Sequence, residues 1–255
     1  MAPVDMAPVD MACVDMAAAP PVTRPVIAIR PEPGCAATVA AGLALGLAME
    51  GWSLFTIRPL AWEAPAPDGV DALLLGSANV LRHAGLALAA YKAKPVYAVG
   101  PATAAAARAA GFNVAAIGPG VLQALLDREA DALPPRLLRM TGVEHVPVEP
   151  PPGSGIITRI VYESVPKAMP APLAERLGAG ALVLLHSAAA ARHFSAECER
   201  LAVPRDKVAL AALGPRIAAA AGSGWADLRC AAEPAENALL ALAVDMCHDL
   251  GPGAG

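Results

Sequence analysis

The stretch that decides the fold is 96–112, VYAVGPATAAAARAAGF. Its apolar start predicts a buried strand, which Gly100-Pro101 ends by turning the chain. We expect Thr103 to cap the alanine-rich helix that follows and Gly111 to end it. Such a turn leaves free backbone N–H groups at a helix start, where an anion can bind. Taken alone, the stretch is more typical of an α/β turn without a ligand.

This pattern recurs in the second half of the chain. Residues 208–218 again predict a strand, a Gly-Pro turn and a helix. A second matched pair, 73–83 and 183–193, predicts in each case a strand that ends in a serine and leads into a helix. The serine unit precedes the Gly-Pro unit in both halves, which indicates an internal duplication. Strands that alternate with helices predict doubly wound parallel sheets, whose ligands bind beyond the carboxyl ends of the strands.

Composition restricts the class of protein. The 255 residues are enough for two domains, with 56% hydrophobic residues, 16% charged residues and a net charge of −4. No basic run suggests nucleic acid, and the apolar stretches are too short and too rich in Ala and Gly for a membrane span. The five cysteines are widely spaced, which favours free thiols in a cytoplasmic protein over disulfides or zinc ligands.

The remaining segments predict the organisation of the chain. Residues 1–23 repeat MAPVD-like units, and we interpret them as a disordered tail or partly as a start-codon artefact. A helix is expected over 36–50. Proline-rich segments at 58–65 and 166–172 predict two crossovers between domains. In 143–163 the prolines and glycines exclude a helix, so we expect an extended arm or a hairpin of 145–149 with 156–163.

The chain resembles the uroporphyrinogen-III synthase family over nearly all of residues 25–248. The resemblance rests on the joint order of six short motifs, which are RP at 30–31, LGSAN at 75–79, VGPATA at 99–104, VYE at 161–163, LHS at 185–187 and LGP at 213–215. It implies two flavodoxin-like doubly wound domains joined by two crossover strands, with a cleft between them. One domain would be discontinuous, 24–60 with 168–250, and the other would span 63–163.

The resemblance also implies an activity in tetrapyrrole (haem) biosynthesis. The family's substrate is hydroxymethylbilane, a linear tetrapyrrole rich in carboxylates. A cytoplasmic, monomeric lyase expels its hydroxyl, inverts the last pyrrole ring and closes the ring of uroporphyrinogen III. No metal, organic cofactor, nucleic acid or membrane takes part. Because the substrate closes unaided to the wrong isomer, the enzyme's main task is to align the reacting carbons.

Eight residues are candidates for this site. The resemblance makes Tyr162 the catalytic candidate, placed to assist departure of the hydroxyl, although packing where the domains join explains it equally well. The expected contacts to substrate carboxylates are Ser77, Thr103, Ser187, Gly100, Gly214, Arg30 and Arg216. Helix capping is an alternative role for the hydroxyl residues. A salt bridge is an alternative for Arg30, and a solvent-facing position for Arg216.

Two departures from the family bear on activity. Arg216-Ile217 stands where the family usually has hydroxyl residues, and Met140–Ser154 replaces a Gly and a second Arg that precede a helix. The loss of that positive charge leaves open a non-catalytic protein of the same fold that binds a carboxylate-rich small molecule. A transferase that binds phosphate through the Gly-Pro loops is disfavoured, because neither loop has the glycine spacing of a phosphate-binding loop.

Overall fold

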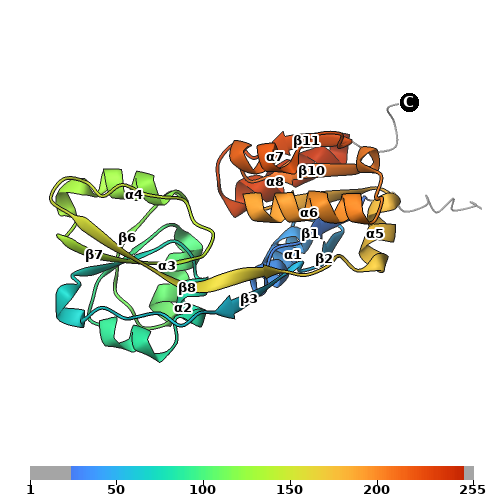
Figure 1. The fold of residues 1–255 in the computed structure, drawn as a ribbon. Coiled ribbons are helices and arrows are strands. Elements are labelled where there is room, and N and C mark those ends of the chain that lie inside the picture. Colours follow the sequence, from blue (N-terminus) through green and yellow to red (C-terminus); the bar gives the residue numbers. More distant parts are fainter. Residues whose placement is uncertain (1–23, 250–255) are drawn as a thin grey trace, which may run out of the picture.

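Two β-sheets organise the protein in a computed structural model that describes residues 24–249 (Figure 1). The first sheet has the order β11-β10-β9-β1-β2, and all its strands are parallel. Its strands are β1 (Val26–Ala28), β2 (Met49–Gly51), β9 (Ala181–Leu185), β10 (Val208–Ala212) and β11 (Asp227–Cys230).

The second sheet has the order β3-β8-β7-β4-β5-β6. Only the β3–β8 pair is antiparallel. Its strands are β3 (Phe55–Pro59), β4 (Ala72–Leu75), β5 (Val96–Ala98), β6 (Val114–Ile117), β7 (Arg136–Gly142) and β8 (Gly155–Pro166). The predicted doubly wound α/β class is therefore confirmed.

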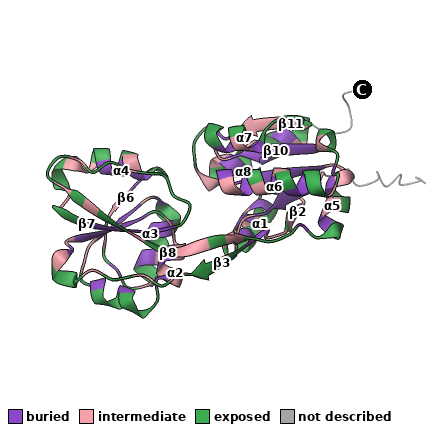
Figure 2. Ribbon diagram, in the orientation of Figure 1, coloured by how far each residue is buried: buried purple, intermediate pink, exposed green. Residues whose placement is uncertain are grey.

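Helices cover both faces of each sheet, and the strands between them are mostly buried (Figure 2). The first sheet has α5 (Ala171–Gly178), α6 (Ala188–Arg200) and α7 (Pro215–Ala221) on one face, and α1 (Gly34–Ala44) and α8 (Glu236–Asp249) on the other. The second sheet has α2 (Asn79–His83) and α3 (Pro101–Ala109) on one face, and α4 (Leu122–Arg128) on the other. The apolar faces of the helices thus form a separate core on each side of each sheet.

The two sheets share one topology. Strands β6-β5-β4-β7-β8 of the second correspond in order to β11-β10-β9-β1-β2 of the first. The serine-ended strands β4 and β9 take equivalent places, and so do β5 and β10, which precede the Gly-Pro turns. The direction of winding reverses between β4 and β7 and between β9 and β1, and ligands of doubly wound sheets bind at such points. This correspondence supports the internal duplication.

Strands β3 and β8 lie at one edge of the second sheet and extend from it toward the first sheet, as Figure 1 shows. They pair from Phe55 opposite Pro166 to Pro59 opposite Tyr162, and Arg58 forms an ion pair with Glu163 across them. The two predicted crossover strands are therefore present, side by side.

Two local predictions were wrong. The helix expected over 36–50 ends at Ala44, because Gly46 adopts a left-handed conformation (φ 80°) and β2 follows. Of the two alternatives expected in 143–163, an extended arm or a hairpin, the hairpin does not form, because β8 pairs with β7 in parallel. Parallel neighbours need a long connection rather than a tight turn, and residues 143–154 provide it without regular structure.

The structure bears on the predicted absence of a membrane span but not on the predicted N-terminal tail. The tail predicted at 1–23 lies outside the described residues. Within residues 24–249, no helix has both the length and the apolar character needed to cross a bilayer.

Candidate functional site

Most predicted site residues lie where strands end. In the second sheet Ser77 follows β4 and Gly100 follows β5, and in the first sheet Arg30 follows β1, Ser187 follows β9 and Gly214 follows β10. Because parallel strands end at a common edge, these residues form two groups, one on each sheet. Within residues 24–249, no side-chain hydrogen bond or ion pair joins any two of the eight candidates.

The carboxyl edges of the two sheets face each other. A Cβ atom added at Gly120, after β6, would lie 2.8 Å from the carbonyl oxygen of Pro234, after β11. Glu144, after β7, forms an ion pair of 3.7 Å with Arg192 on α6. Both contacts come from segments beyond the carboxyl ends of strands. The two groups of candidates therefore lie on opposing edges.

The Gly-Pro turn after β5 is locked by backbone packing. A Cβ atom at Gly118 would lie only 2.8 Å from the carbonyl oxygen of Val99, and the N–H of Gly120 donates to that oxygen at 2.8 Å. The predicted capping role of Thr103 is wrong, because α3 already begins at Pro101 and Thr103 is buried in its first turn. Proline is favoured at the first helical position, since its missing N–H leaves no donor unpaired there. The helix ends as expected, with Gly111 in a left-handed conformation.

Ser187 and Ser77 both accept backbone hydrogen bonds at helix starts. The Oγ of Ser187 accepts from the N–H of Ala190 at 3.1 Å and caps α6, while Ser77 Oγ accepts from Asn79 at 3.2 Å. We expect Ser187→Ala to lower the free energy of unfolding by about 1 kcal/mol, as loss of an N-cap typically does. Urea denaturation measures this, and unchanged stability would contradict a capping role.

Tyr162 lies in β8 beside the end of β7. Its ring packs on Gly142, where a Cβ atom would come within 2.6 Å of it, and its centroid is 6.3 Å from that of His83. Burial lowers the pKa of His83, with the Arg82 charge acting in the same direction. No side chain or backbone group among residues 24–249 makes a hydrogen bond to the Tyr162 hydroxyl. The phenol is therefore free to donate to a ligand.

Arg30 is occupied by an acidic residue that the sequence did not reveal. Its Nη1 lies 2.9 Å from Glu236 Oε2, and the other oxygen of Glu236 accepts from Thr38 at 2.5 Å. The Nε2 of His186 lies 3.1 Å from Glu236 Oε2. This cluster stands at the reversal point between β1 and β9. The carboxylate of Glu236 thus takes the place in which a ligand carboxylate was expected.

The protonation states of His186 and Glu236 leave one negative and one positive charge in this cluster. Burial lowers the pKa of His186, so the imidazole is neutral at pH 7 and the Arg30 charge is balanced by Glu236. Burial acts to raise the pKa of Glu236, but hydrogen bonds from His186 and Thr38 and the charge of Arg30 lower it to about 2. The salt-bridge alternative for Arg30 therefore describes the structure.

Glu236→Gln tests this balance. The folded-state pKa lies below the ordinary value of 4.5, so the carboxylate stabilises the fold above that pH and loses its effect as pH falls towards 2. We expect the variant to be less stable at pH 7 by on the order of 1 kcal/mol, since a third of the side chain is exposed and solvent screens the charge. Urea unfolding should show this gap shrinking below pH 4.5. A gap that does not change with pH would contradict the assignment.

Arg216 remains available to a ligand. It is exposed at the start of α7 and has no ion-pair partner among the described residues. Residues 24–249 contain no group of three or more His, Cys, Asp or Glu side chains arranged to hold a metal ion.

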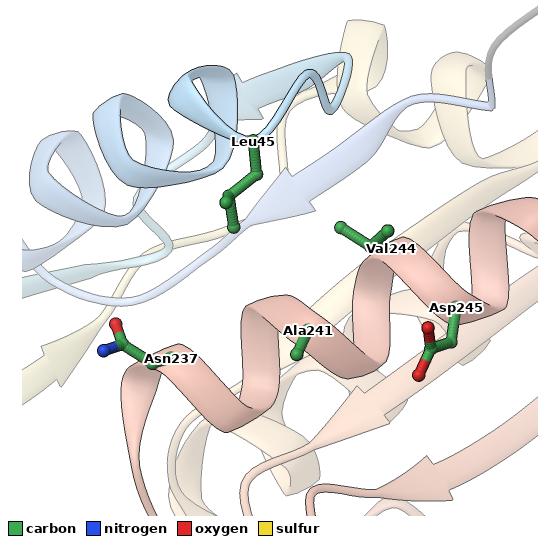
Figure 3. A pocket seen from close by; sticks show the side chains of 5 residues that line it. All are labelled: Leu45, Asn237, Ala241, Val244 and Asp245. Carbon is green, nitrogen blue, oxygen red and sulfur yellow. The ribbon is translucent and has the colours of Figure 1, made fainter.

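A surface hollow of about 480 Å³ lies between α1 and α8 (Figure 3). Leu45, Asn237, Ala241, Val244 and Asp245 line it. Its only charged group is the carboxylate of Asp245, which would repel a polyanion. The hollow therefore does not suit a carboxylate-rich substrate.

Comparison with known proteins identifies the fold. The chain matches no protein-family model and no curated protein. It is similar to the solved structure of uroporphyrinogen-III synthetase from Helicobacter pylori, with 16% identity, a TM-score of 0.58, and coverage of 88% of this chain and 99% of that chain. A mutant uroporphyrinogen III synthase from the extremely thermophilic bacterium Thermus thermophilus gives 17% identity, a TM-score of 0.49, and coverage of 89% and 99%. The match to the Helicobacter pylori structure shows that the chain has the two-domain fold of that uroporphyrinogen-III synthetase, as the resemblance predicted.

Proposed function

We propose that this chain is a cyclising lyase that converts hydroxymethylbilane into uroporphyrinogen III. The observation that carries the proposal is the opposition of two carboxyl edges, each at the binding end of a doubly wound sheet. A linear tetrapyrrole held by both edges can be bent so that its two ends meet. Alignment of this kind is the main catalytic requirement, because the substrate closes without help.

The groups at these edges suit a substrate rich in carboxylates. The starts of α3 and α6 present backbone N–H groups beside Gly100 and Ser187, and helix N-termini attract anions. Arg216 adds an exposed positive charge. Arg30 contributes no free charge, because Glu236 already neutralises it.

Tyr162 is the proposed proton donor. When the C–O bond of the hydroxymethyl group breaks, the leaving oxygen takes a proton and departs as water. The phenol O–H of Tyr162 can supply this hydrogen bond as a general acid. The substituted α-carbon of the last pyrrole ring then attacks the freed carbon and forms a spiro intermediate. The older bond from that α-carbon to the methylene bridge breaks, and the bridge bonds instead to the ring's other α-carbon, whose hydrogen leaves as a proton and restores the phenol. The ring is thereby inverted, which gives isomer III.

The test is a product analysis. Hydroxymethylbilane is incubated with the chain, and the oxidised products are separated into isomers I and III. We expect isomer III to form with the chain and isomer I alone with heat-denatured protein. Isomer I alone in both samples would overturn the proposal.

A binding protein without turnover is the second candidate. The neutralised Arg30 favours it, together with the irregular 143–154 connection in place of the family's helix and second arginine. Such a protein would bind hydroxymethylbilane and slow its spontaneous closure to isomer I. An enzyme would speed its consumption, so the rate of substrate loss separates the two.

A further inference from the structure

Arg139 is a buried positive charge that has no counter-ion among residues 24–249. It lies on β7, where only 6% of the residue is exposed. Its only hydrogen bond to the described residues runs from Nη2 to the carbonyl oxygen of Val146, at 2.6 Å. Its Nε is buried and meets no acceptor in the part of the chain that the structure describes. Burial also lowers the pKa of Arg139, and no neighbouring carboxylate offsets this. A buried guanidinium without an anion is destabilising, so its retention here calls for a ligand.

The first domain shows how the same fold satisfies an arginine on the corresponding strand, although the register places Arg139 opposite Leu74 as it places Ala28, two residues before Arg30, opposite Leu184. Arg30 follows β1, which corresponds to β7, and its guanidinium is paired with Glu236 at 2.9 Å. No carboxylate plays that part for Arg139 among residues 24–249. Each of these corresponding strands thus has an arginine in it or just after it, and among residues 24–249 Arg139 lacks the carboxylate partner that Arg30 has.

A covering loop, residues 143–154, carries the Val146 carbonyl that accepts the hydrogen bond of Arg139. Its second half is fastened to α4, because the side chain of Gln123 donates to the Glu149 carbonyl at 3.2 Å and accepts from its N–H at 2.9 Å. Its first half is largely exposed, with half the surface of Val146 open to solvent. One ion pair, Glu144 with Arg192, attaches that half to the first domain. The N–H of Val143 anchors the start of this half by donating to the Tyr162 carbonyl at 3.0 Å. Among the described residues the Val146 carbonyl accepts only from Arg139, so displacing it breaks one hydrogen bond.

We propose that Arg139 binds a carboxylate group of an organic polyacid, which displaces the carbonyl of Val146. Nε and Nη2 form one edge of a guanidinium, and the two oxygens of a carboxylate match that edge with parallel hydrogen bonds. The carbonyl satisfies only one of the two donors. A carboxylate would satisfy both and would also neutralise the charge.

A carboxylate suits this site better than a phosphate. It carries one negative charge, which a single buried arginine balances. A phosphate dianion would bring a second charge into a buried place that offers no further cation. Thr141, two residues along β7 and also buried, extends the polar surface on the same side of the strand.

The test follows the Arg139 Nε–H signal in ¹⁵N-labelled full-length protein by NMR. The signal is identified by its absence from Arg139→Lys, and propane-1,2,3-tricarboxylate is titrated at constant ionic strength. We expect a saturable shift of this signal. In parallel, calorimetry should show affinity about 10-fold to 100-fold weaker in Arg139→Gln, as expected for loss of a charged hydrogen-bond donor.

Arg136→Lys is the matched control, because Arg136 lies on the same strand but pairs at the surface with Asp71. It should bind the tricarboxylate like the unmodified chain. Inorganic phosphate should bind more weakly than the tricarboxylate. The proposal is overturned by the absence of a saturable shift in the unmodified chain, by undiminished affinity in Arg139→Gln, or by phosphate binding at least as tight. The titration itself uses the unmodified protein, so its result does not depend on whether a variant folds. Arg139→Lys serves only to identify the signal.

Carboxylate binding at Arg139 does not require the cyclisation proposed above. A chain that binds the tricarboxylate but forms no isomer III would keep this site and refute the proposed function. A chain that forms isomer III but shows no shift at Arg139 would refute only this site.

Discussion

Gly118→Ala should lower the free energy of unfolding by about 3 kcal/mol, the upper end of the usual range for overpacking. The added Cβ would lie 2.8 Å from the carbonyl oxygen of Val99 and 2.9 Å from the Cβ of Leu125. Neither atom can swing away, because one belongs to the backbone and the other is the first side-chain atom of a buried residue. Moving Val99 would also break its hydrogen bond with the Gly120 N–H. Urea denaturation measures the loss.

Gly214→Ala is the control for this prediction. Gly214 follows the equivalent strand β10, has extended backbone, and a Cβ atom there meets no atom within 4 Å. The free energy of unfolding of this variant should stay within about 0.5 kcal/mol of that of the unmodified protein. Equal losses in the two variants would show that close packing at Gly118 is not the cause.

Tyr162→Phe should slow the formation of isomer III by about 10²-fold or less, the low end for general acid catalysis. The effect stays partial because the hydroxyl leaves the substrate readily. Stability should change little, since the ring on Gly142 is kept and the lost hydroxyl has no hydrogen-bond partner among residues 24–249. The measurements are initial rates of isomer III formation and thermal melting.

Tyr91→Phe is the matched control, because it should lower stability without changing the rate of isomer III formation. The Tyr91 hydroxyl donates to the carbonyl of Pro65, and its ring is fully buried in the second domain. Its loss should reduce stability and leave the rate unchanged. If Tyr162→Phe keeps the rate of the unmodified protein, Tyr162 serves packing, and catalysis depends on substrate alignment alone.

Short-range patterns predicted much of this fold. The serine-ended strands and the Gly-Pro turns appear in matched order, because buried strand length and breaker residues are local properties. The end of α1 was missed, since Gly46 interrupts an otherwise apolar, helix-forming run. The partner of β8 was missed as well. Alternation shows that a strand exists, but the choice between an antiparallel and a parallel neighbour depends on tertiary packing.

The site was harder to predict than the fold. Arg30 was recognised as a candidate, but its partner Glu236 lies 206 positions away along the chain, and no local signal links them. His186 was left without a role for the same reason. Arg139 was not among the predicted candidates, because a sequence does not show whether a charge is buried or paired. Ser187 and Gly111, whose roles depend on adjacent backbone, were placed correctly.

The central claim is that the opposed carboxyl edges direct cyclisation of hydroxymethylbilane. The most direct measurement is the ratio of isomer III to isomer I at a fixed substrate concentration, as the concentration of the chain is raised. Spontaneous closure proceeds at a constant rate and competes with the directed reaction. The fraction of isomer III should therefore rise with protein concentration until it is nearly complete. A product that remains isomer I at every protein concentration would contradict the claim.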